Sequence, residues 1–320
     1  MSTKEKLLQL LETRRGDYFS GEELAKSLEV SRAAVWKAVN ALRKDGYSIE
    51  AVTNRGYSLA SDTDILSAQG IRKYLSCPEP EITVLPTVES TNDLVRQKAA
   101  AGAPEGTLVI AGGQTAGKGR SGREFFSPEG TGIYLSLLLR PEQLTGGASV
   151  GVTTLAAAAM CQAVERVTGR RPGIKWVNDI FLDGKKICGI LTEGSFSMET
   201  GMLQYAVLGV GVNVYSPEGG FPEELKDVAG VLAESRENDL KNRLTAEFLN
   251  SFYGFYRGNG DYTRIYREYS IVIGREVAVL SSQGERRARV LGIDDACRLQ
   301  LEYDTGETDC LSYGEIRIRI

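Results

Sequence analysis

Hydrophobic residues recur every three or four positions at the start of the chain, and this spacing predicts three short helices. We expect them over residues 4–13, 21–28 and 32–44. Ser20 and Glu23 have the spacing of a capping box, in which each side chain bonds a backbone N–H at the start of the second helix. Alternating residues over 47–59 then predict a β-hairpin with Arg55 at its tip. Three helices followed by a hairpin indicate a winged helix-turn-helix domain.

The third predicted helix has one apolar face, with Val35, Val39 and Leu42, and one polar, cationic face. Such a polar face is what a recognition helix presents to the DNA major groove. We predict base-edge contacts from Ala33, Lys37 and Asn40 and phosphate contacts from Arg32, Arg43 and Arg55. A single module binds DNA weakly, so a dimer on a two-fold-symmetric operator is expected. A three-helix module for protein contacts is the alternative, with its lysines merely solvated.

Charge and composition narrow the class of protein. Residues 1–60 hold ten Lys and Arg against eight Asp and Glu, whereas the whole chain has a net charge of −4, so the amino-terminal end is locally basic. The absence of histidine excludes Ser-His-Asp and Cys-His catalysis. The five cysteines contain no C-x-x-C pair, which argues for reduced thiols and against a zinc site. With no apolar run of membrane-spanning length and no signal peptide, we expect a cytoplasmic protein without membrane contact.

Beyond a polar stretch at 61–64, strand-like and helix-like segments alternate. We expect helices over 65–75, 152–167 and 242–256, and strands over 108–111, 133–139, 186–191 and 205–214. The short strands in hairpin-like order favour an α+β fold with a mixed sheet over a doubly wound parallel sheet. Neither a dinucleotide-binding glycine motif nor a P-loop occurs. From residue 274 the chain alternates around glycine turns, which suggests a small SH3-like β-barrel. The expected domains are 1–62, 63–271 and 272–320.

A glycine-rich loop threaded with cations gives the clearest chemical signal. Residues 112–123 carry Lys118, Arg120 and Arg123 among glycines. Backbone N–H groups can approach an anion closely where there is no Cβ, and the cations neutralise its charge. Flexible linkers rarely carry cations at this spacing, so we predict anion binding. Phe125 follows and could stack on an adenine ring, with core packing an equally good interpretation.

Polar residues gather in four further segments. The hydroxyls and amide of Glu89-Ser-Thr-Asn-Asp93 could cradle a urea-like head group or simply cap a helix. Lys175-Trp-Val-Asn-Asp179 could bind ribose, metal or phosphate, or merely end an edge strand. Asp183-Gly184 predicts a hairpin that leads to Lys186. Facing inward among Ile and Leu, this lysine would need an anion, and an outward orientation is the alternative. The glycines within 208–213 expose strand backbone to a ligand or mark a bulge.

Taken together, in this order and spacing, these motifs resemble those of the bifunctional biotin protein ligases that also repress the biotin operon. The resemblance covers essentially the whole chain. It implies an ATP-dependent ligase that forms biotinyl-5′-AMP and passes biotin to a lysine of the biotin carboxyl carrier protein of acetyl-CoA carboxylase or a related carboxylase. It also implies a transcriptional repressor with biotinyl-5′-AMP as corepressor, which pairs as a homodimer on operator DNA. Biotin, ATP and Mg²⁺ are the small molecules so implied.

The resemblance also implies roles for individual residues. Biotin would be held by Ser90, Thr91, Asn92, Gln114, Lys118, Gly119, Arg120, Lys186 and Gly189. ATP would be held by Arg120, Arg123, Phe125, Asn178, Asp179 and Asn213. The catalytic residues would be Lys186, Arg120 and Asp179. Because a carboxylate attacks a phosphate in this reaction, cations must offset the repulsion between the two, and Lys186 is expected to bridge them. Asp179 could orient the acceptor lysine or accept its proton.

Two positions depart from the family pattern. Lys118 stands where arginine is usual, which keeps the charge but loses the bidentate fork. Val177 stands where proline is usual, which removes a restraint on φ. Two other functions stay open. A lipoate-protein ligase would need no ureido cradle and would leave the winged helix unexplained. A biotin-sensing repressor that no longer catalyses is disfavoured by Lys186 and the cationic loop.

Overall fold

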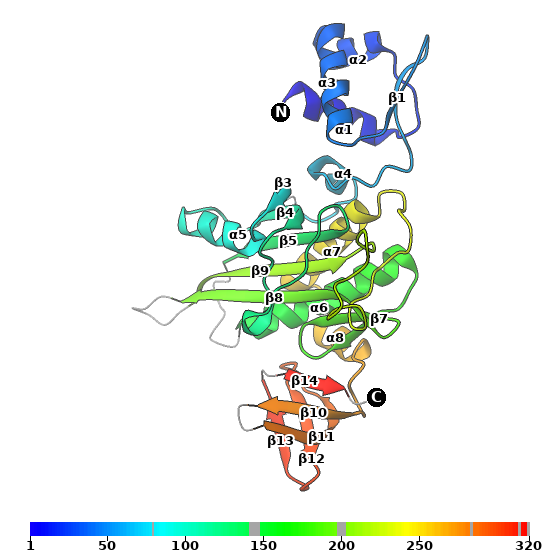
Figure 1. The fold of residues 1–320 in the computed structure, drawn as a ribbon. Helices are drawn as coiled ribbons and strands as arrows, with labels where there is room; N and C mark the ends of the chain where they lie inside the picture. The colour runs from blue at the N-terminus through cyan, green and yellow to red at the C-terminus, as the bar shows by residue number, and fades with distance from the viewer. Residues whose placement is uncertain (79, 141–147, 197–202, 282–283, 313–314, 319–320) are drawn as a thin grey trace. The chain divides into compact units, whose positions relative to one another are not determined.

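The computed structural model describes residues 1–78, 80–140, 148–196, 203–281, 284–312 and 315–318 (Figure 1). The chain forms two compact units. The first contains residues 1–79 with 235–247, and the second contains 80–234 with 248–320. The finer boundaries at 62/63 and 271/272 stay a prediction.

The first unit begins with three helices and a hairpin, as predicted. The helices are α1 (Thr3–Thr13), α2 (Gly21–Ser27) and α3 (Arg32–Lys44), and the hairpin is formed by β1 (Ile49–Val52) and β2 (Gly56–Leu59). Ser20 and Glu23 form the predicted capping box, and Ser31 caps α3. Leucines from all three helices meet in a core with Val35 and Val39, from which solvent is excluded. The winged helix-turn-helix prediction is confirmed.

The helix expected over 65–75 is much shorter than predicted. Only α4 (Ala68–Arg72) forms, with Ser67 as its N-cap. The preceding backbone bonds elsewhere, because Asn242 Nδ2 donates to the Ile65 carbonyl at 2.8 Å and the Ser67 N–H donates to Asn242 Oδ1 at 3.0 Å. Asp64 likewise accepts the backbone N–H of Lys241 at 2.9 Å. Long-range side-chain hydrogen bonds therefore replace the first helical turn.

The second unit is built on a seven-stranded mixed sheet in the order β3-β4-β5-β9-β8-β7-β6. The strands are β3 (Glu81–Val88), β4 (Thr107–Gln114), β5 (Gly132–Leu139), β6 (Gly173–Lys175), β7 (Asp179–Leu182), β8 (Lys185–Phe196) and β9 (Leu203–Asn213). Only the β3–β4 pairing is parallel. The mixed α+β sheet is thus confirmed, and so is the hairpin at Asp183-Gly184, which joins β7 to β8. The edge-strand interpretation of Lys175 also holds, since β6 lies at the edge of the sheet, whereas β3 was not predicted.

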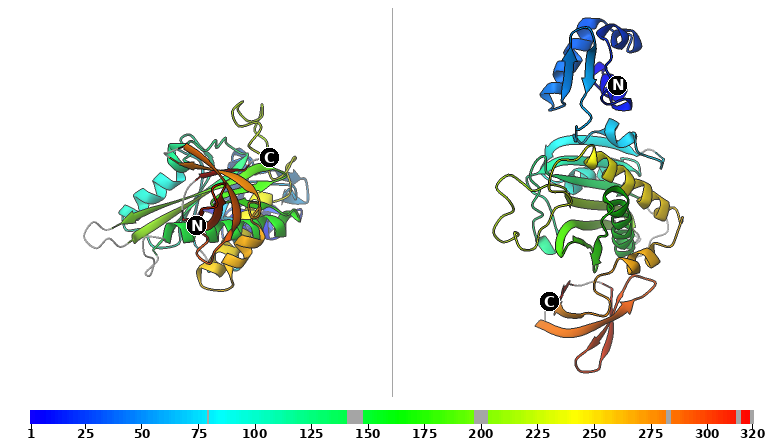
Figure 2. Two further views of the ribbon diagram at one scale, coloured as in Figure 1. Left: turned by 90° about the horizontal axis from the view of Figure 1, so that it is seen from below. Right: turned by 90° about the vertical axis from the view of Figure 1, so that its right-hand side faces the viewer.

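Both faces of this sheet are covered, since all eight residues of β5 are buried. On one face, Val95 and Ala99 of α5 (Thr91–Ala100) pack on Val109, Leu138 and Val207. On the other lies α6 (Ala148–Thr168), where the hydroxyls of Thr153 and Thr192 meet at 2.7 Å. Figure 2 shows α6 in green against the sheet, with the loop that follows β9 on the opposite side. Two further helices are α7 (Leu240–Tyr256) and α8 (Tyr262–Glu268).

The last segment is an antiparallel sheet in the order β13-β12-β11-β10-β14. Its strands are β10 (Glu276–Ser281), β11 (Gly284–Ile293), β12 (Leu299–Tyr303), β13 (Thr308–Leu311) and β14 (Glu315–Ile318). Val277, Val290 and Leu301 are fully buried. Within the described residues β13 and β14 do not pair, so hydrogen bonds do not close the expected barrel. No helix of the described chain is long and apolar enough to cross a membrane.

Candidate functional site

A cavity of about 690 Å³ opens on the α5 side of the central sheet. This volume is typical of a site for a small molecule. Thirteen of the fourteen residues predicted for biotin or ATP line it, namely Ser90, Thr91, Asn92, Gln114, Lys118, Gly119, Arg120, Arg123, Phe125, Asn178, Asp179, Lys186 and Gly189. Asn213 is the exception, because it lies at the end of β9 opposite Gly132 and is not among the lining residues. The fold therefore brings together segments that are almost a hundred residues apart.

The glycine-rich loop is folded as a narrow hairpin. The Gly119 N–H donates to the Arg123 carbonyl at 2.7 Å, and the Phe125 N–H donates to the Gly117 carbonyl at 2.8 Å. The hairpin turns at Ser121 and Gly122, whose φ angles of 57° and 73° lie in the left-handed region. This region favours glycine and costs little at an exposed tip. The loop thus has defined structure, unlike a linker.

Three cations of the site have carboxylate or amide partners. Lys118 Nζ lies 2.7 Å from the Asp93 carboxylate, and Arg120 Nη1 donates to Asn178 Oδ1 at 2.9 Å. Lys186 Nζ lies 2.7 Å from Asp179 Oδ1. Lys186 therefore faces the cavity, and the anion that its inward position requires is at present Asp179.

One oxygen of Asp179 is poorly satisfied. Its Oδ1 is buried and accepts no hydrogen bond among the described residues, because the contact with Lys186 has the distance of an ion pair without the angles of a hydrogen bond. A buried acceptor in this state can take a further donor or a metal ion. Mg²⁺ is usually held by one or two carboxylates together with substrate phosphates. Among the described residues, no group of three or more His, Cys, Asp or Glu side chains could hold a metal ion by itself.

The polar wall near α5 is a connected network. Thr91 donates from its backbone N–H and its hydroxyl to Gln114 Oε1, at 2.9 and 3.0 Å. Asn92 Nδ2 donates to Glu193 Oε2 at 2.7 Å, and Ser136 Oγ lies 2.6 Å from Asn92 Oδ1. Ser90 is the N-cap of α5 and also lines the cavity, so the two interpretations of this motif are compatible.

Sequence reasoning missed Ser136 and Glu193, which hold Asn92 in place. Ser136 is a single polar residue in the apolar run of β5 and is fully buried. A buried hydroxyl needs a hydrogen-bond partner, so its position inside that run was a usable signal. Glu193 gave no comparable signal, because its contact depends on the pairing of β8 with β9.

The strand glycines make room for side chains. A Cβ at Gly211 would lie 2.6 Å from Phe125 Cε1, and a Cβ at Gly209 would lie 2.2 Å from Asn92 Oδ1. The bulge interpretation is wrong, since the register of β9 with β5 and β8 is regular at both positions. Phe125 meets Tyr134 edge-on, with ring centroids 6.4 Å apart, and also lines the cavity. It is therefore both packed and available to a ligand.

Two hydrogen bonds fix the turn between β6 and β7. The Trp176 indole N–H donates to the Cys297 carbonyl at 3.0 Å, and the Tyr266 hydroxyl donates to the Val177 carbonyl at 3.0 Å. The turn that carries Asn178 and Asp179 is thereby held without the usual proline. Nearby, burial raises the pKa of the Cys188 thiol, which keeps it neutral and unreactive.

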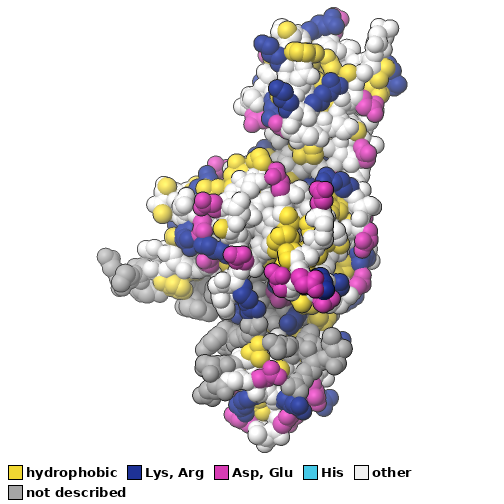
Figure 3. All heavy atoms as spheres, in the orientation of Figure 1, with side chains coloured by type: hydrophobic (Ala, Val, Ile, Leu, Met, Phe, Trp, Pro, Cys, Tyr) yellow, Lys and Arg dark blue, Asp and Glu magenta, His cyan; other side chains and the backbone are white. Residues whose placement is uncertain are grey.

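The predicted DNA contacts differ in how they are held. Ala33 and Lys37 are exposed on α3, as is Arg32, whereas Asn40 is half-buried. Arg43 donates from Nε and Nη2 to the Ile49 carbonyl, at 2.9 and 2.6 Å, and Arg55 lies 4.0 Å from the centre of the Tyr18 ring. Figure 3 shows lysine and arginine side chains in dark blue over this domain. Sequence reasoning left out Trp36, which is 58% exposed on the same helix.

Three sequence-family models match the chain in succession. They are the HTH domain over residues 3–58, the biotin/lipoate A/B protein ligase family over 84–213 and the biotin protein ligase C-terminal domain over 272–319. The bifunctional ligase/repressor BirA of Bacillus spizizenii is 36% identical over 308 residues, which cover 94% of each chain. The chain belongs to the bifunctional biotin ligase/repressor family.

Other members of biotin ligase families share part of the chain. The biotin–[acetyl-CoA-carboxylase] ligase of Mycobacterium tuberculosis is 33% identical over 247 residues, covering 74% of this chain and 88% of its own. Among solved structures, the biotin protein ligase from Aquifex aeolicus in complex with biotin and ATP is similar, with a TM-score of 0.60 and 25% identity. It covers 75% of this chain and 98% of its own. The bifunctional family thus accounts for the winged helix, the cavity and the last sheet together.

Proposed function

We propose that this chain is an ATP-dependent ligase that forms biotinyl-5′-AMP and transfers biotin to a lysine of a biotin carboxyl carrier protein. We also propose that it is a DNA-binding repressor of biotin genes with biotinyl-5′-AMP as corepressor. The observation that carries the proposal is one cavity with a neutral polar cradle at one side and five cationic side chains, from the glycine-rich loop and two strands, at another. That arrangement suits a neutral ring joined to a carboxylate that must meet a triphosphate.

The cradle would bind the ureido ring of biotin. A urea group has one carbonyl acceptor and two N–H donors, so it needs both donors and acceptors around it. Thr91, Gln114 and Asn92 supply hydroxyl and amide groups that are already oriented. Ser136 bonds Thr91 and Asn92, Glu193 bonds Asn92, and Ser127 bonds Gln114. Side chains held in advance lose little entropy when the ligand arrives.

Lys186 would bring the two anions together. The biotin carboxylate attacks the α-phosphate of ATP, pyrophosphate leaves, and negative charge builds on the phosphate oxygens. Lys186 can contact both groups if its ammonium moves from Asp179 to the ligands, while Arg120 and Arg123 line the same cavity. Mg²⁺ held by Asp179 and the phosphates would neutralise further charge, with Asn178 beside it. Phe125 would stack on the adenine.

Transfer to the carrier protein would follow in the same cavity. The amine of the acceptor lysine attacks the biotinyl carbonyl, and AMP leaves. The glycine-rich hairpin would shield the mixed anhydride from water before the acceptor arrives. Asp179 would orient the incoming ammonium group or accept its proton.

Pyrophosphate exchange into ATP tests this function directly. We expect exchange with biotin and none with lipoate or without an acid. Exchange with lipoate instead would favour the lipoate-protein ligase. Binding of biotin with no exchange would favour a repressor that has lost catalysis. Lys186→Gln should lower the exchange rate by about 10²–10³-fold, because it removes charge that acts on the transition state. Lys186→Arg keeps the charge and is the matched control.

Repression would require two winged helices on one operator. We propose that biotinyl-5′-AMP orders the loops around the cavity and thereby promotes a homodimer, as ligand-ordered segments do in other switches. Analytical ultracentrifugation should show more dimer with biotin plus ATP than with either alone. A sedimentation coefficient that ignores both compounds would contradict this part of the proposal.

A further inference from the structure

The glycine-rich hairpin is attached to the two sides of the cavity through different bonds. On one side, Lys118 Nζ lies 2.7 Å from the Asp93 carboxylate of α5. On the other, Arg120 Nη1 donates to Asn178 Oδ1, and Asn178 is itself fixed by a 2.9 Å bond from Nδ2 to the Ile190 carbonyl. Lys118, Arg120 and Asn178 line the cavity, and Asp93 follows the lining residue Asn92, so the hairpin has an anchor on each side.

The Asp93 anchor is firmly placed. Asp93 lies in the first turn of α5, where a negative charge is stabilised by the helix dipole, and its backbone N–H bonds to the Ser90 cap. Arg96 contacts the same carboxylate from the next turn. The residues just before Asp93 form the polar wall of the cavity, so this anchor joins the hairpin to the predicted biotin cradle.

We propose that Lys118 and Asp93 form a latch that keeps the hairpin closed over biotinyl-5′-AMP and so slows its release. The inference rests on the proposed function, because it needs the adenylate to exist. Lys118 and Asp93 act as positioning residues in this account. The ammonium group of Lys118 is engaged by a carboxylate, which makes it a poor candidate for a direct phosphate contact in this closed arrangement.

The chemistry of the pair suits a latch that must also open. The two side chains are 41% and 27% exposed, and ion pairs with this much exposure are weak and screened by salt. A lysine has a single compact ammonium, whereas an arginine could hold the carboxylate through two parallel hydrogen bonds. Lysine at this position should therefore close the hairpin and still allow the acceptor protein to enter.

The test measures release of preformed radiolabelled biotinyl-5′-AMP from the full-length chain after a chase with unlabelled biotin and ATP. We expect Asp93→Asn and Lys118→Gln each to speed release by about two- to five-fold, the range expected for a partly exposed ion pair. The charge-swapped double variant D93K/K118D should restore only part of the retention, because a cation in the first turn of α5 is opposed by the helix dipole and by Arg96. Lys98→Gln is the matched control, because it removes a cation from the last turn of the same helix, away from Asp93, and its release rate should be unchanged.

The dependence of the release rate on salt concentration distinguishes a latch from a purely structural role. In the unmodified chain, release should become faster between about 0.05 and 0.5 M NaCl and approach the Asp93→Asn rate, while the variant should respond little. Thermal unfolding of each variant checks that the fold is intact. Adenylate that forms normally and leaves Asp93→Asn and Lys118→Gln at the unmodified rate would overturn the latch alone. Failure of the unmodified chain to form any adenylate would overturn the proposed function and the latch with it.

Discussion

At the scale of single residues, Lys186 and Asp179 form an ion pair inside the site. The ammonium and the carboxylate compensate one another at 2.7 Å. Both are partly screened from solvent, with 27% and 23% of their side chains exposed. Biotin and ATP bring negative charge, so their binding must draw Lys186 away from Asp179 or add a cation beside it. Under the proposed function, the arrival of substrate would free the Asp179 carboxylate for Mg²⁺ and then for the acceptor lysine.

We predict that Asp179→Asn slows transfer of biotin more than it slows formation of the adenylate. The asparagine amide oxygen can still ligate Mg²⁺, although without charge, and Lys186 loses a competing anion, so adenylate formation should fall only modestly. The change also removes the group proposed to orient the acceptor ammonium, so transfer should fall by about 10²-fold, the size typical of a lost acid–base group. Single-turnover transfer to a carrier domain and pyrophosphate exchange measure the two steps separately. An equal loss in both would argue against this role.

At the scale of elements, strand β9 shapes the cavity through the residues that lack side chains. Its Gly209 and Gly211 face the cavity, while Leu208 and Val210 alternate toward the other face and are buried. The two glycines leave the space that Asn92 and Phe125 fill. The proposed adenine platform, Phe125, and the proposed biotin cradle around Asn92 would thus both depend on bare positions of one strand.

Gly211→Ala should displace the Phe125 ring and raise the KM for ATP more than the KM for biotin. The new Cβ would lie 2.6 Å from the ring, and overpacking of this kind costs about 1–3 kcal/mol of stability. Gly254→Ala is the control, because a Cβ there meets nothing within 4 Å in the last turn of α7. That variant should gain about 0.5–1 kcal/mol in the free energy of unfolding. Steady-state kinetics and urea unfolding give both quantities, and an unchanged KM for ATP would place the adenine elsewhere.

Elements with strong local signals were predictable, and the ones that rely on distant partners were not. The capped helices α2 and α3 begin where Ser20 and Ser31 indicate, because the caps are local. Strand β3 was missed because it contains Pro86, which is tolerated only because β3 is the edge of its sheet. The predicted length of helix α4 was too great, because the Asn242 side chain forms hydrogen bonds with the backbone just before it. The site was predictable as a set of motifs, whereas Ser136 and Glu193 required knowledge of strand pairing.

At the scale of the whole molecule, distant segments of the first unit are held together by buried charge. The Arg15 guanidinium bonds Glu12 at 2.7 and 2.8 Å, Asp239 at 2.7 Å and the Thr63 carbonyl at 2.6 Å. The side chains of Arg15 and Asp239 are only 6% and 1% exposed. This network joins the end of α1 to a residue more than two hundred positions later, which no local pattern could reveal.

Arg15→Met should destabilise the first unit by about 3–5 kcal/mol. The change leaves Glu12 and Asp239 buried without their common cation, and an uncompensated buried charge is costly. Arg14→Met is the matched control, since Arg14 is 64% exposed and its contact with Asp17 is 3.5 Å long. That control should stay within about 0.5 kcal/mol of the unmodified chain. Urea unfolding followed by circular dichroism compares the two, and similar midpoints would show that the network contributes little.

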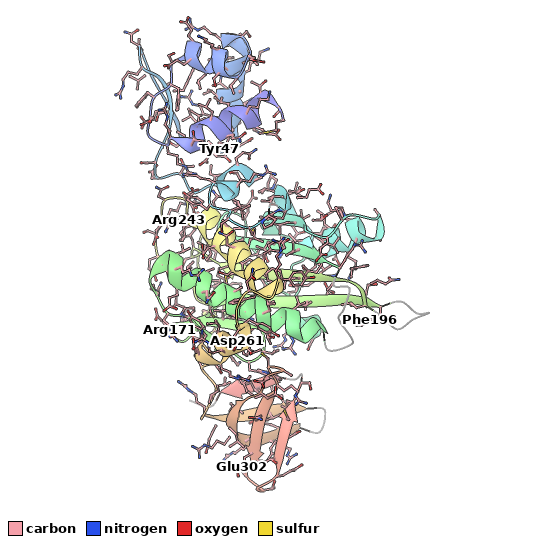
Figure 4. The ribbon with its side chains drawn as sticks, turned by 180° about the vertical axis from the view of Figure 1, so that it is seen from behind. Tyr47, Arg171, Phe196, Arg243, Asp261 and Glu302 are labelled. Carbon is pink, nitrogen blue, oxygen red and sulfur yellow. The ribbon has the colours of Figure 1, made fainter. Side chains whose placement is uncertain are left out.

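The free energy of unfolding should also depend on pH in the alkaline range, because both units contain buried tyrosines. Burial raises the pKa of Tyr47, which lies in the first unit (Figure 4), and of Tyr134 in the second, each to about 12. The unfolded chain releases the phenolic proton near pH 10, whereas the folded chain keeps it to about pH 12. The unfolded state therefore binds fewer protons in this window, and each tyrosine should lower the free energy of unfolding by about 1.4 kcal/mol per pH unit. Below pH 10 these tyrosines should not make the free energy of unfolding depend on pH.

Tyr47→Phe should isolate one of these contributions. Near pH 8 the variant should be less stable by about 0.5–1.5 kcal/mol, because it loses the hydrogen bond between the Tyr47 hydroxyl and Ser67. Between pH 10 and 12 it should lose stability more slowly than the unmodified chain, so the two stability curves should converge and then cross. Chemical unfolding at pH 8, 10, 11 and 12 measures the difference. Curves that stay parallel over this range would mean that Tyr47 ionises at the same pH in the folded and unfolded chain.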